Sequence, residues 1–343
     1  MLAANYLGAR NIEIRHLDPE PVGPGQVRIE VAYTGICGTD LHIFHGHMDA
    51  RVDIPAIIGH EMSGRIAVIG EGVAGWQVGD HVTVMPLRWD GTCPGCMAGH
   101  QHICQNLDFV GIDSPGALQR FWNVDADVLV ALPDGLRLDH AALVEPVAVA
   151  VHDVRRGEVS AGDHVVVLGG GPIGVLIATV ARHSGAEVVV VELDEGRRAS
   201  ITELGFEVLD PTNTDQVDWV TNWTAGAGAD IVFEVSGAAS AMLASTDLVK
   251  VRGTVVVVAI HPQPRPVNLQ RVFWRELRLL GARVYERTDF ERAIELLDTG
   301  VIPADALIST IRPISQTVDA FADLEAGRAM KVLIDLGASG DPK

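Results

Sequence analysis

Two hydrophobic patterns divide the chain near residue 150. Before that point apolar and polar residues alternate, as at Val27, Ile29 and Val31 after a Gly-Pro-Gly turn, and glycine turns separate short runs of this kind. Alternation with a period of two is typical of strands that bury one face. The first 145 residues are therefore predicted to be mostly β-structure.

Beyond residue 150, apolar runs of four or five residues alternate with segments long enough to be helices. The runs are HVVVLG, EVVVVE, ADIVFEVSG and GTVVVVAI. Strands that are apolar on both faces are typical of a parallel sheet covered by helices on both sides. The end of the chain returns to an amphipathic helix, DFERAIELLDTG, and shorter pieces. The pattern thus predicts a doubly wound α/β domain after a β-rich region.

Length and charge narrow the possible classes of protein. The 343 residues favour two domains, and the 45 acidic residues outnumber the 26 basic ones, for a net charge of −19. This charge repels nucleic-acid phosphates and anionic lipids, so neither is an expected partner. The longest apolar stretch is interrupted by glycines and a proline at 169–172, and the first residues lack the features of a secretory signal. We expect no membrane segment and a cytoplasmic location.

A glycine loop follows the first apolar run of the predicted α/β domain. It has the spacing G-x-G-x-x-G, a helix-length segment follows it, and the next run ends at the acidic Glu192. Such a loop binds a pyrophosphate at a helix N-terminus, and the acidic side chain accepts hydrogen bonds from a ribose and disfavours a 2′-phosphate. We expect NAD to be bound by Gly169, Gly171, Pro172, Ile173, Gly174, Glu192 and Arg197. The alternative for the glycine loop is a purely structural turn. Arg197 and Arg198 could weaken the preference for NAD, or they could simply be solvated charges.

Candidate metal ligands gather in two short motifs of the β-rich region. GICGTDLH contains Cys37, Thr39, Asp40 and His42, and IIGHEMSG contains the adjacent pair of His60 and Glu61. Thiolate, imidazole and carboxylate are the ligands of catalytic zinc, which keeps a further position open. Taken singly, each residue has a structural alternative, such as a buried thiol, a core histidine or a helix cap.

Together with the glycine loop, these motifs resemble the zinc-containing medium-chain alcohol and polyol dehydrogenases over essentially the whole chain. The acidic Glu145, in the segment VEPVAVAVH, is typical of the butanediol, threonine and sorbitol dehydrogenase branch, which this chain resembles most. The resemblance implies a Rossmann doubly wound parallel sheet inserted in a GroES-like β-rich catalytic domain. The expected domains are 149–283 for NAD binding, and 1–148 plus 284–343 for catalysis.

The resemblance also implies the roles of the site residues. Cys37, His60 and Glu61 would bind the catalytic zinc, with Glu145 as an exchangeable or water-bridged ligand. The hydroxyl of Thr39 and the ring of His42 would carry a proton through the cofactor ribose to solvent. Asp40 would orient a ligating histidine, as carboxylates near metal sites commonly do.

The related enzymes carry a second, structural zinc in a lobe with the spacing C-x2-C-x2-C-x7-C. Here, within about 88–106, the first cysteine is replaced by aspartate. A carboxylate can bind zinc, so the expected ligands are Asp90, Cys93, Cys96 and Cys104. Rival ligands are His100 and His102, and a further alternative is a lobe without a metal.

These features predict an enzyme that transfers a hydride between a small secondary alcohol, diol or polyol, such as 2,3-butanediol, and NAD. The resemblance implies a homo-oligomer, a dimer or tetramer. The alternatives are an L-threonine 3-dehydrogenase and a non-catalytic NAD-binding protein of the same fold.

Gln119 and Arg120 stand where the related chains have small and acidic residues, and the sequence offers no reason for this difference. Phe44, Trp76 and Trp274 are candidate pocket residues, although large apolar side chains more often belong to the core.

Overall fold

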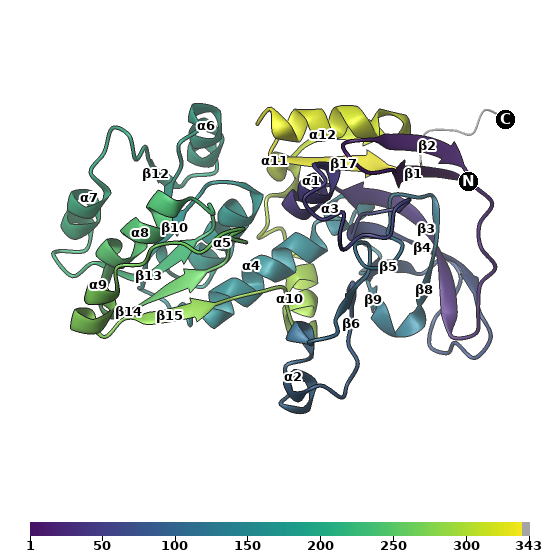
Figure 1. Cartoon of the computed structure of the whole chain (residues 1–343), viewed down its shortest axis with the longest axis horizontal. Coiled ribbons are helices and arrows are strands. Elements are labelled where there is room, and N and C mark those ends of the chain that lie inside the picture. Colours follow the sequence, from purple (N-terminus) through teal and green to yellow (C-terminus); the bar gives the residue numbers. More distant parts are fainter. Residues whose placement is uncertain (338–343) are drawn as a thin grey trace. The chain divides into compact units, whose positions relative to one another are not determined.

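The structure, a computed structural model, describes residues 1–337 and divides into two compact units (Figure 1). Unit 1 consists of Met1–Glu145 and the described part of Glu286–Lys343, and unit 2 is Pro146–Tyr285. Unit 1 is therefore built from residues before and after unit 2. Helix α4 (Val144–Arg156) contains the first boundary between the units.

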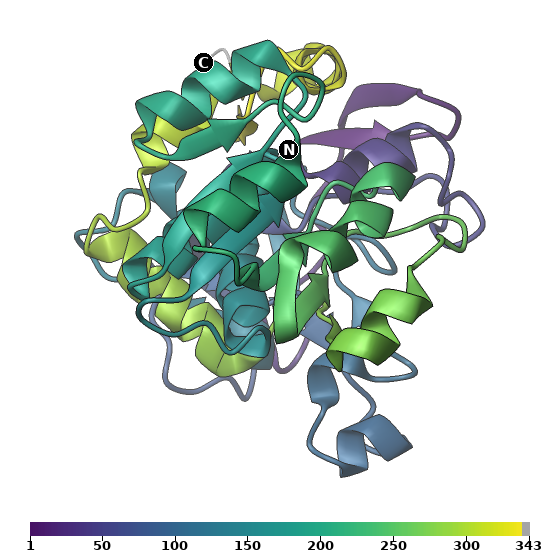
Figure 2. The same ribbon diagram turned by 90° about the vertical axis from the view of Figure 1, so that its left-hand side faces the viewer.

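Unit 2 contains a six-stranded parallel sheet (Figure 2). Its strands in chain order are β10 (His164–Leu168), β11 (Glu187–Val191), β12 (Glu207–Leu209), β13 (Ala229–Glu234), β14 (Val249–Val257) and β15 (Arg278–Gly281). Their spatial order is β12-β11-β10-β13-β14-β15. The order reverses at β10, and the crevice beyond the carboxyl ends of the strands at such a reversal is where α/β sheets bind ligands.

The predicted apolar runs form the centre of this sheet. Val166, Val189, Val232 and Val255, one from each of β10, β11, β13 and β14, are fully buried in one core cluster. The other helices of unit 2 are α5 (Pro172–His183), α6 (Glu195–Glu203), α7 (Gln216–Trp223), α8 (Ala239–Leu248) and α9 (Leu269–Arg275). Because right-handed crossovers run in opposite directions from β10, the helices cover both faces of the sheet. The predicted Rossmann architecture is confirmed.

A seven-stranded sheet forms the centre of unit 1. It runs in the order β16-β17-β3-β4-β5-β9, with β8 paired to β3. The strands of unit 1 are β1 (Leu2–Tyr6), β2 (Ile12–His16), β3 (Gln26–Gly35), β4 (Glu61–Ile69), β5 (His81–Val84), β6 (Leu87–Arg88), β7 (Asp108–Phe109), β8 (Phe121–Asp125), β9 (Leu129–Ala131), β16 (Ile308–Pro313) and β17 (Lys331–Asp335). Strand β17 pairs antiparallel with β3, with Leu333 opposite Gly35. The last described strand is thus placed beside an early one.

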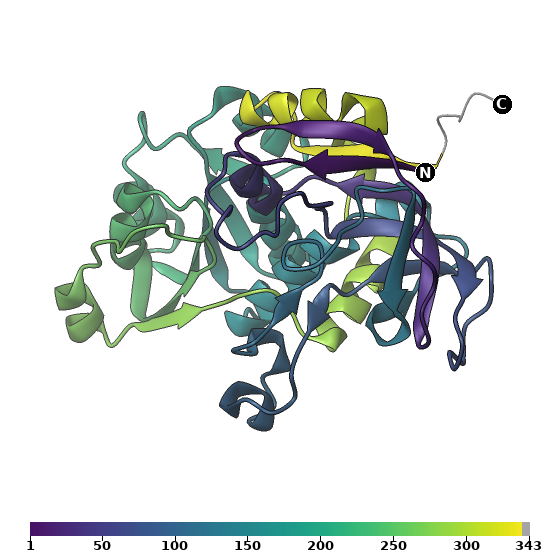
Figure 3. The ribbon, with the colours of Figure 1, turned by 45° about the vertical axis from the view of Figure 1, so that its right-hand side comes forward.

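Short helices connect these strands. They are α1 (Gly38–Phe44), α2 (Pro94–Met97), α3 (Leu138–Ala141), α10 (Arg287–Asp298), α11 (Ala304–Leu307) and α12 (Thr317–Glu325). The lobe around α2 projects from the strands of unit 1 (Figure 3). Phe44 packs on Phe321 of α12, with ring centroids 4.7 Å apart, so it belongs to the core. Among residues 1–337, no helix combines the length and apolar character needed to cross a membrane.

Candidate active site and metal centres

Cys37 and His60 meet at the ends of two paired strands. Cys37 follows β3 and caps α1, and His60 directly precedes β4. The antiparallel register sets Gly35 opposite Glu61, which brings the two side chains together. Sγ of Cys37 and Nε2 of His60 are 3.1 Å apart. A sulfur and a ring nitrogen this close can bind a single zinc ion.

Asp40 lies beside both of these donors and hydrogen-bonds to the backbone of one of them. One carboxylate oxygen accepts the backbone N–H of Cys37 at 2.9 Å, and the other lies 3.7 Å from Nδ1 of His60. Asp40 is 1% exposed. A carboxylate at Nδ1 orients the ring and leaves Nε2 for a metal, as in many zinc sites. The expected role of Asp40 in orienting His60 stays a prediction.

Burial and charge shape the protonation of this pair. Burial raises the pKa of the Cys37 thiol, and the charge of His60 opposes that rise. Burial alone would lower the pKa of His60, but the charges of Cys37 and Asp40 raise it well above its usual value. A cation at this point would favour the thiolate and the neutral imidazole that zinc needs, so the donor set fits the metal.

Glu61, by contrast, is held by a lysine. Its two carboxylate oxygens accept from Nζ of Lys331 at 2.8 and 2.6 Å, and Lys331 also donates to the carbonyl of Ile36 at 3.2 Å. Both side chains are almost fully buried. Burial lowers the pKa of Lys331, but the Glu61 carboxylate raises it above its usual value, so the lysine is charged. Glu61 is not among the donors that lie within 4.8 Å of Cys37 and His60.

Sequence analysis missed Lys331 and Gly35. A Cβ on Gly35 would stand 2.2 Å from a carboxylate oxygen of Glu61, so the glycine leaves the space that the carboxylate occupies. The signal for Lys331 was a lysine at the head of an otherwise apolar strand, KVLID. Such a residue, if buried, needs an anionic partner.

Glu145 faces the same centre from the first turn of α4. It is 5% exposed, and its negative charge contributes to the raised pKa of both His60 and Lys331. The expected role of Glu145 as an exchangeable oxygen ligand stays a prediction.

The two predicted relay residues share one face of α1. Thr39 and His42 are three positions apart, which places them on neighbouring turns. The backbone N–H of Thr39 donates to Sγ of Cys37 at 3.2 Å. Burial, followed by the charges of His47 and His45, lowers the pKa of His42.

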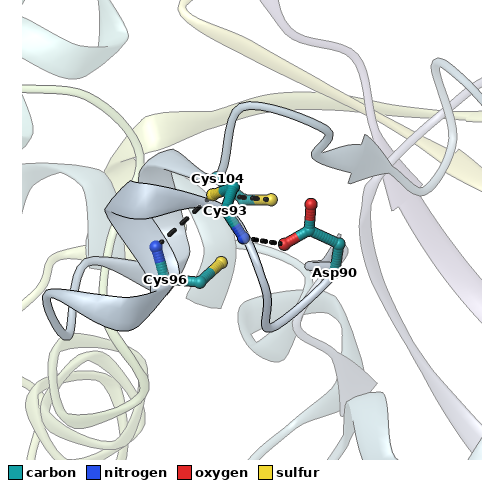
Figure 4. Close-up of side chains that lie close together, drawn as sticks. All are labelled: Asp90, Cys93, Cys96 and Cys104. Atoms are coloured by element: carbon teal, nitrogen blue, oxygen red, sulfur yellow. Dashed lines mark hydrogen bonds between the residues drawn. The ribbon is translucent and has the colours of Figure 1, made fainter.

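The three cysteines of the lobe and Asp90 gather around one point (Figure 4). One donor atom from each of these four residues lies within 4.8 Å of the others, and the cysteines are free thiols. Sγ of Cys93 and Sγ of Cys104 are 3.8 Å apart. Two thiolates on a tetrahedral zinc with bonds of about 2.3 Å are separated by about 3.8 Å. The lobe therefore has the dimensions of a zinc site.

Asp90 also acts locally as a cap. One oxygen accepts the backbone N–H groups of Thr92 and Cys93 at 2.8 and 3.0 Å, and the other accepts from the amide of Asn106 at 2.6 Å. These bonds hold its pKa far below the usual range, so the side chain is an anion. The rival His100 and His102 do not belong to the four-residue group. His102 is nearly buried, with its Nδ1 3.8 Å from Glu286.

The glycine loop joins β10 to α5. Gly171 caps α5 without a side-chain bond, Pro172 occupies the first helical turn, and Ile173 follows it. A Cβ on Gly174 would stand 1.9 Å from the carbonyl oxygen of Gly169, so only glycine allows this turn. The uncapped N–H groups at the start of the helix suit a pyrophosphate.

Glu192 stands directly after β11, beside this loop. Its carboxylate accepts the backbone N–H groups of Gly170 and Asp194, both at 2.8 Å. Arg197 approaches the same carboxylate at 3.8 Å, whereas Arg198 pairs with Asp210 at 3.2 Å. Each of the two arginines thus lies beside an acidic side chain, and Arg197 is the one beside Glu192.

Gln119 and Arg120, which the sequence left unexplained, have partners within unit 1. The amide of Gln119 donates to the carbonyl of Gly116 at 2.7 Å, and the side chain is 5% exposed. Arg120 pairs with Glu30 at 3.3 Å and lies over the ring of Phe121. Their surroundings account for them as packing residues of the β-rich unit.

Comparison with known proteins identifies the family of the chain. Residues 23–134 match the family model described as alcohol dehydrogenase GroES-like domain, and residues 172–299 match the one described as zinc-binding dehydrogenase. The chain is 49% identical to a 2-dehydro-3-deoxy-L-galactonate 5-dehydrogenase of Pseudoalteromonas atlantica, over 98% of this chain and 99% of that one.

Solved structures show the same fold. The 2R,3R-butanediol dehydrogenase of Bacillus subtilis superposes with a TM-score of 0.90 at 30% identity, covering 97% of this chain and 99% of that chain. A zinc-binding dehydrogenase of Sinorhizobium meliloti bound to NADP gives 0.92 at 32% identity, covering 97% and 98%.

The fold and these likenesses define a zinc-dependent oxidoreductase that acts on CH–OH groups with a nicotinamide dinucleotide. The chain belongs to the zinc-containing medium-chain alcohol and polyol dehydrogenase family.

Proposed function

We propose that the protein oxidises a secondary hydroxyl of a sugar acid, with NAD as the hydride acceptor. The observation that carries this proposal is the 49% identity, over nearly the whole of both chains, with the 2-dehydro-3-deoxy-L-galactonate dehydrogenase. The sequence-based expectation was a small secondary alcohol, diol or polyol, such as 2,3-butanediol. The butanediol dehydrogenase shares only 30% identity, which moves the proposal to the sugar acid.

Cys37 and His60 would hold the catalytic zinc, together with an oxygen of Glu61 or Glu145. When bound, zinc lowers the pKa of a hydroxyl and the nicotinamide accepts a hydride. Asp40 keeps the His60 ring turned so that Nε2 is available. Thr39 and His42 would pass the hydroxyl proton along one face of α1 to solvent.

The proposal extends to the choice of cofactor, the structural zinc and the oligomeric state. Glu192 would favour NAD, because its charge repels a 2′-phosphate, although the Sinorhizobium relative binds NADP. Asp90, Cys93, Cys96 and Cys104 would hold a structural zinc. The free thiols of these sites suit a reducing cytoplasm. We also propose that the protein forms a homo-oligomer, either a dimer or a tetramer.

The test is a substrate panel of 2-dehydro-3-deoxy-L-galactonate, 2,3-butanediol, sorbitol and L-threonine, each with NAD and with NADP. We expect the highest kcat/KM for the sugar acid with NAD. A higher kcat/KM for butanediol or threonine would show that the proposed substrate is wrong. NAD binding without turnover of any of these compounds would favour the non-catalytic alternative.

A further inference from the structure

His42 does not stand alone at the end of α1. Its Nδ1 lies 3.5 Å from Nδ1 of His47, and both rings are exposed. Two imidazoles can share a hydrogen bond when one donates its N–H and the other accepts. The separation is at the outer limit of such a bond, and a small rotation of either exposed ring shortens it.

The backbone holds this pair together. The N–H of Gly46 donates to the carbonyl of Ile43 at 2.8 Å, and the N–H of His47 donates to the carbonyl of His42 at 3.0 Å. This is the pattern of a Schellman cap, which brings the residue two beyond the helix end back onto its last turn. Gly46 has a φ of +80°, a conformation that favours glycine. The cap therefore sets His47 beside His42.

We propose that His47 is the positioning residue of the proton relay, holding the His42 ring and passing its proton on to water. This inference rests on the proposed function, in which His42 takes up the proton of the substrate hydroxyl. His42 accepts that proton at Nε2, and its Nδ1 proton moves to Nδ1 of His47. His47 then releases one proton from Nε2 to water, and exchange with water restores the starting tautomers. One proton enters, one leaves, and no oxidation state changes.

His45 completes the cluster but has another partner. Its Nε2 contacts the carboxylate of Glu325, whose two oxygens also accept from Arg10 at 2.5 and 2.8 Å. The hydrogen bond from His45 lowers the pKa of Glu325. The His45 ring lies 5.5 Å from the His47 ring, and no hydrogen bond joins these two rings. His45 is therefore a matched control for His47.

The charge of His47 adds a measurable consequence. Burial is the main cause that lowers the pKa of His42, and the charges of His47 and then His45 lower it further. His47→Gln removes one of these charges, so the pKa of His42 should rise. Because a base must be neutral to accept a proton, the acid limb of the pH-rate profile for oxidation should move to higher pH.

The experiment measures single-turnover oxidation by the zinc-loaded enzyme, so that product release does not mask proton transfer. We expect His47→Ala to slow this step on the order of tenfold below neutral pH, and added imidazole to restore it. His45→Ala should stay near the wild-type rate and should not respond to imidazole. Gly46→Ala, which keeps both rings but strains the cap, should resemble His47→Ala.

An unchanged rate in His47→Ala, or a loss that imidazole does not restore, would overturn the role of His47. His42→Ala separates the two proposals: a wild-type rate there would refute the relay itself, whereas a slow His42→Ala beside a fast His47→Ala refutes only the inference. NMR titration of isotope-labelled histidines in the NAD-free protein gives an independent result. The pKa of His42 should rise more in His47→Gln than in His45→Gln, and equal shifts would contradict the pairing.

Discussion

Both carboxylate oxygens of Glu61 lie within 2.8 Å of Nζ of Lys331, and both side chains are almost fully buried in unit 1. A buried ion pair of this kind costs much to break, because the remaining charge is left without a partner. Lys331 also neutralises the charge of Glu61, the carboxylate that was expected to bind zinc. Zinc bound at this site would therefore have to compete with Lys331 for Glu61.

Removal of the lysine should reveal this competition. Lys331→Met should lower the free energy of unfolding by about 3 to 5 kcal/mol in zinc-free protein, because Glu61 becomes an unpaired buried charge. With zinc bound the loss should be smaller, since the released carboxylate gains a cation. The measurement is denaturant unfolding with and without a chelator, with Lys331→Arg as the variant that keeps the charge. Equal losses in both conditions would contradict the competition.

Gly35 should prove intolerant of a side chain. In Gly35→Ala the new methyl group meets Glu61 at 2.2 Å, so the carboxylate must leave its place beside Lys331. We expect weaker zinc retention and a loss of kcat/KM on the order of tenfold, as for changes that disturb metal surroundings. The matched control is Gly135→Ala, because a Cβ on Gly135 meets no atom within 4 Å. Similar activity and zinc content in the two variants would show that the space is not needed.

The lobe should lose its metal when Asp90 loses its charge. Metal analysis should give two zinc ions per chain in the wild type and one in Asp90→Ala. Asp90→Asn separates the two roles of the residue, because an amide oxygen still accepts the N–H groups of Thr92 and Cys93 but is a poor zinc ligand. We expect one zinc in Asp90→Asn and two in Asp90→Cys. Two zinc ions in both the alanine and asparagine variants would refute an aspartate ligand.

The choice of cofactor should depend on Glu192. Glu192→Gln keeps the size of the side chain and removes the charge that repels a 2′-phosphate, while Arg197 remains nearby. We expect the ratio of kcat/KM for NADP to that for NAD to rise by about tenfold or more, since like charges brought together cost several kcal/mol. Glu195→Gln, in the first turn of α6, is the control. A wild-type enzyme that prefers NADP would overturn the assignment.

Local spacing explains why much of the architecture and the candidate site could be predicted. The apolar runs became β10, β11, β13 and β14, because strands buried on both faces need continuous apolar residues. Cys93 and Cys96 lie three residues apart at the start of one helical turn, so their closeness follows from backbone geometry. The same reasoning places Thr39 and His42 on one face of α1.

Other features had no local signal. Gln119 bonds to Gly116, and Arg120 contacts Glu30 and Phe121. Gly116 and Phe121 are close in the sequence, but whether these side chains meet depends on the folded sheet. Substrate choice was predicted only as far as an alcohol or polyol, because the side chains that select a substrate are scattered along the chain. The likeness to a sugar-acid dehydrogenase supplied the narrower proposal.

The sequence by itself determined the class of sheet, the glycine loop and the short-range donor motifs, because each depends on residues a few positions apart. Only the tertiary structure decided that Glu61 meets Lys331, 270 residues away, and that His42 has His47 as its neighbour. The first meeting requires β17 to pair with β3, and the second requires the chain to reverse at Gly46. Burial then makes the first contact energetically important, since a charge without water needs a partner of opposite sign.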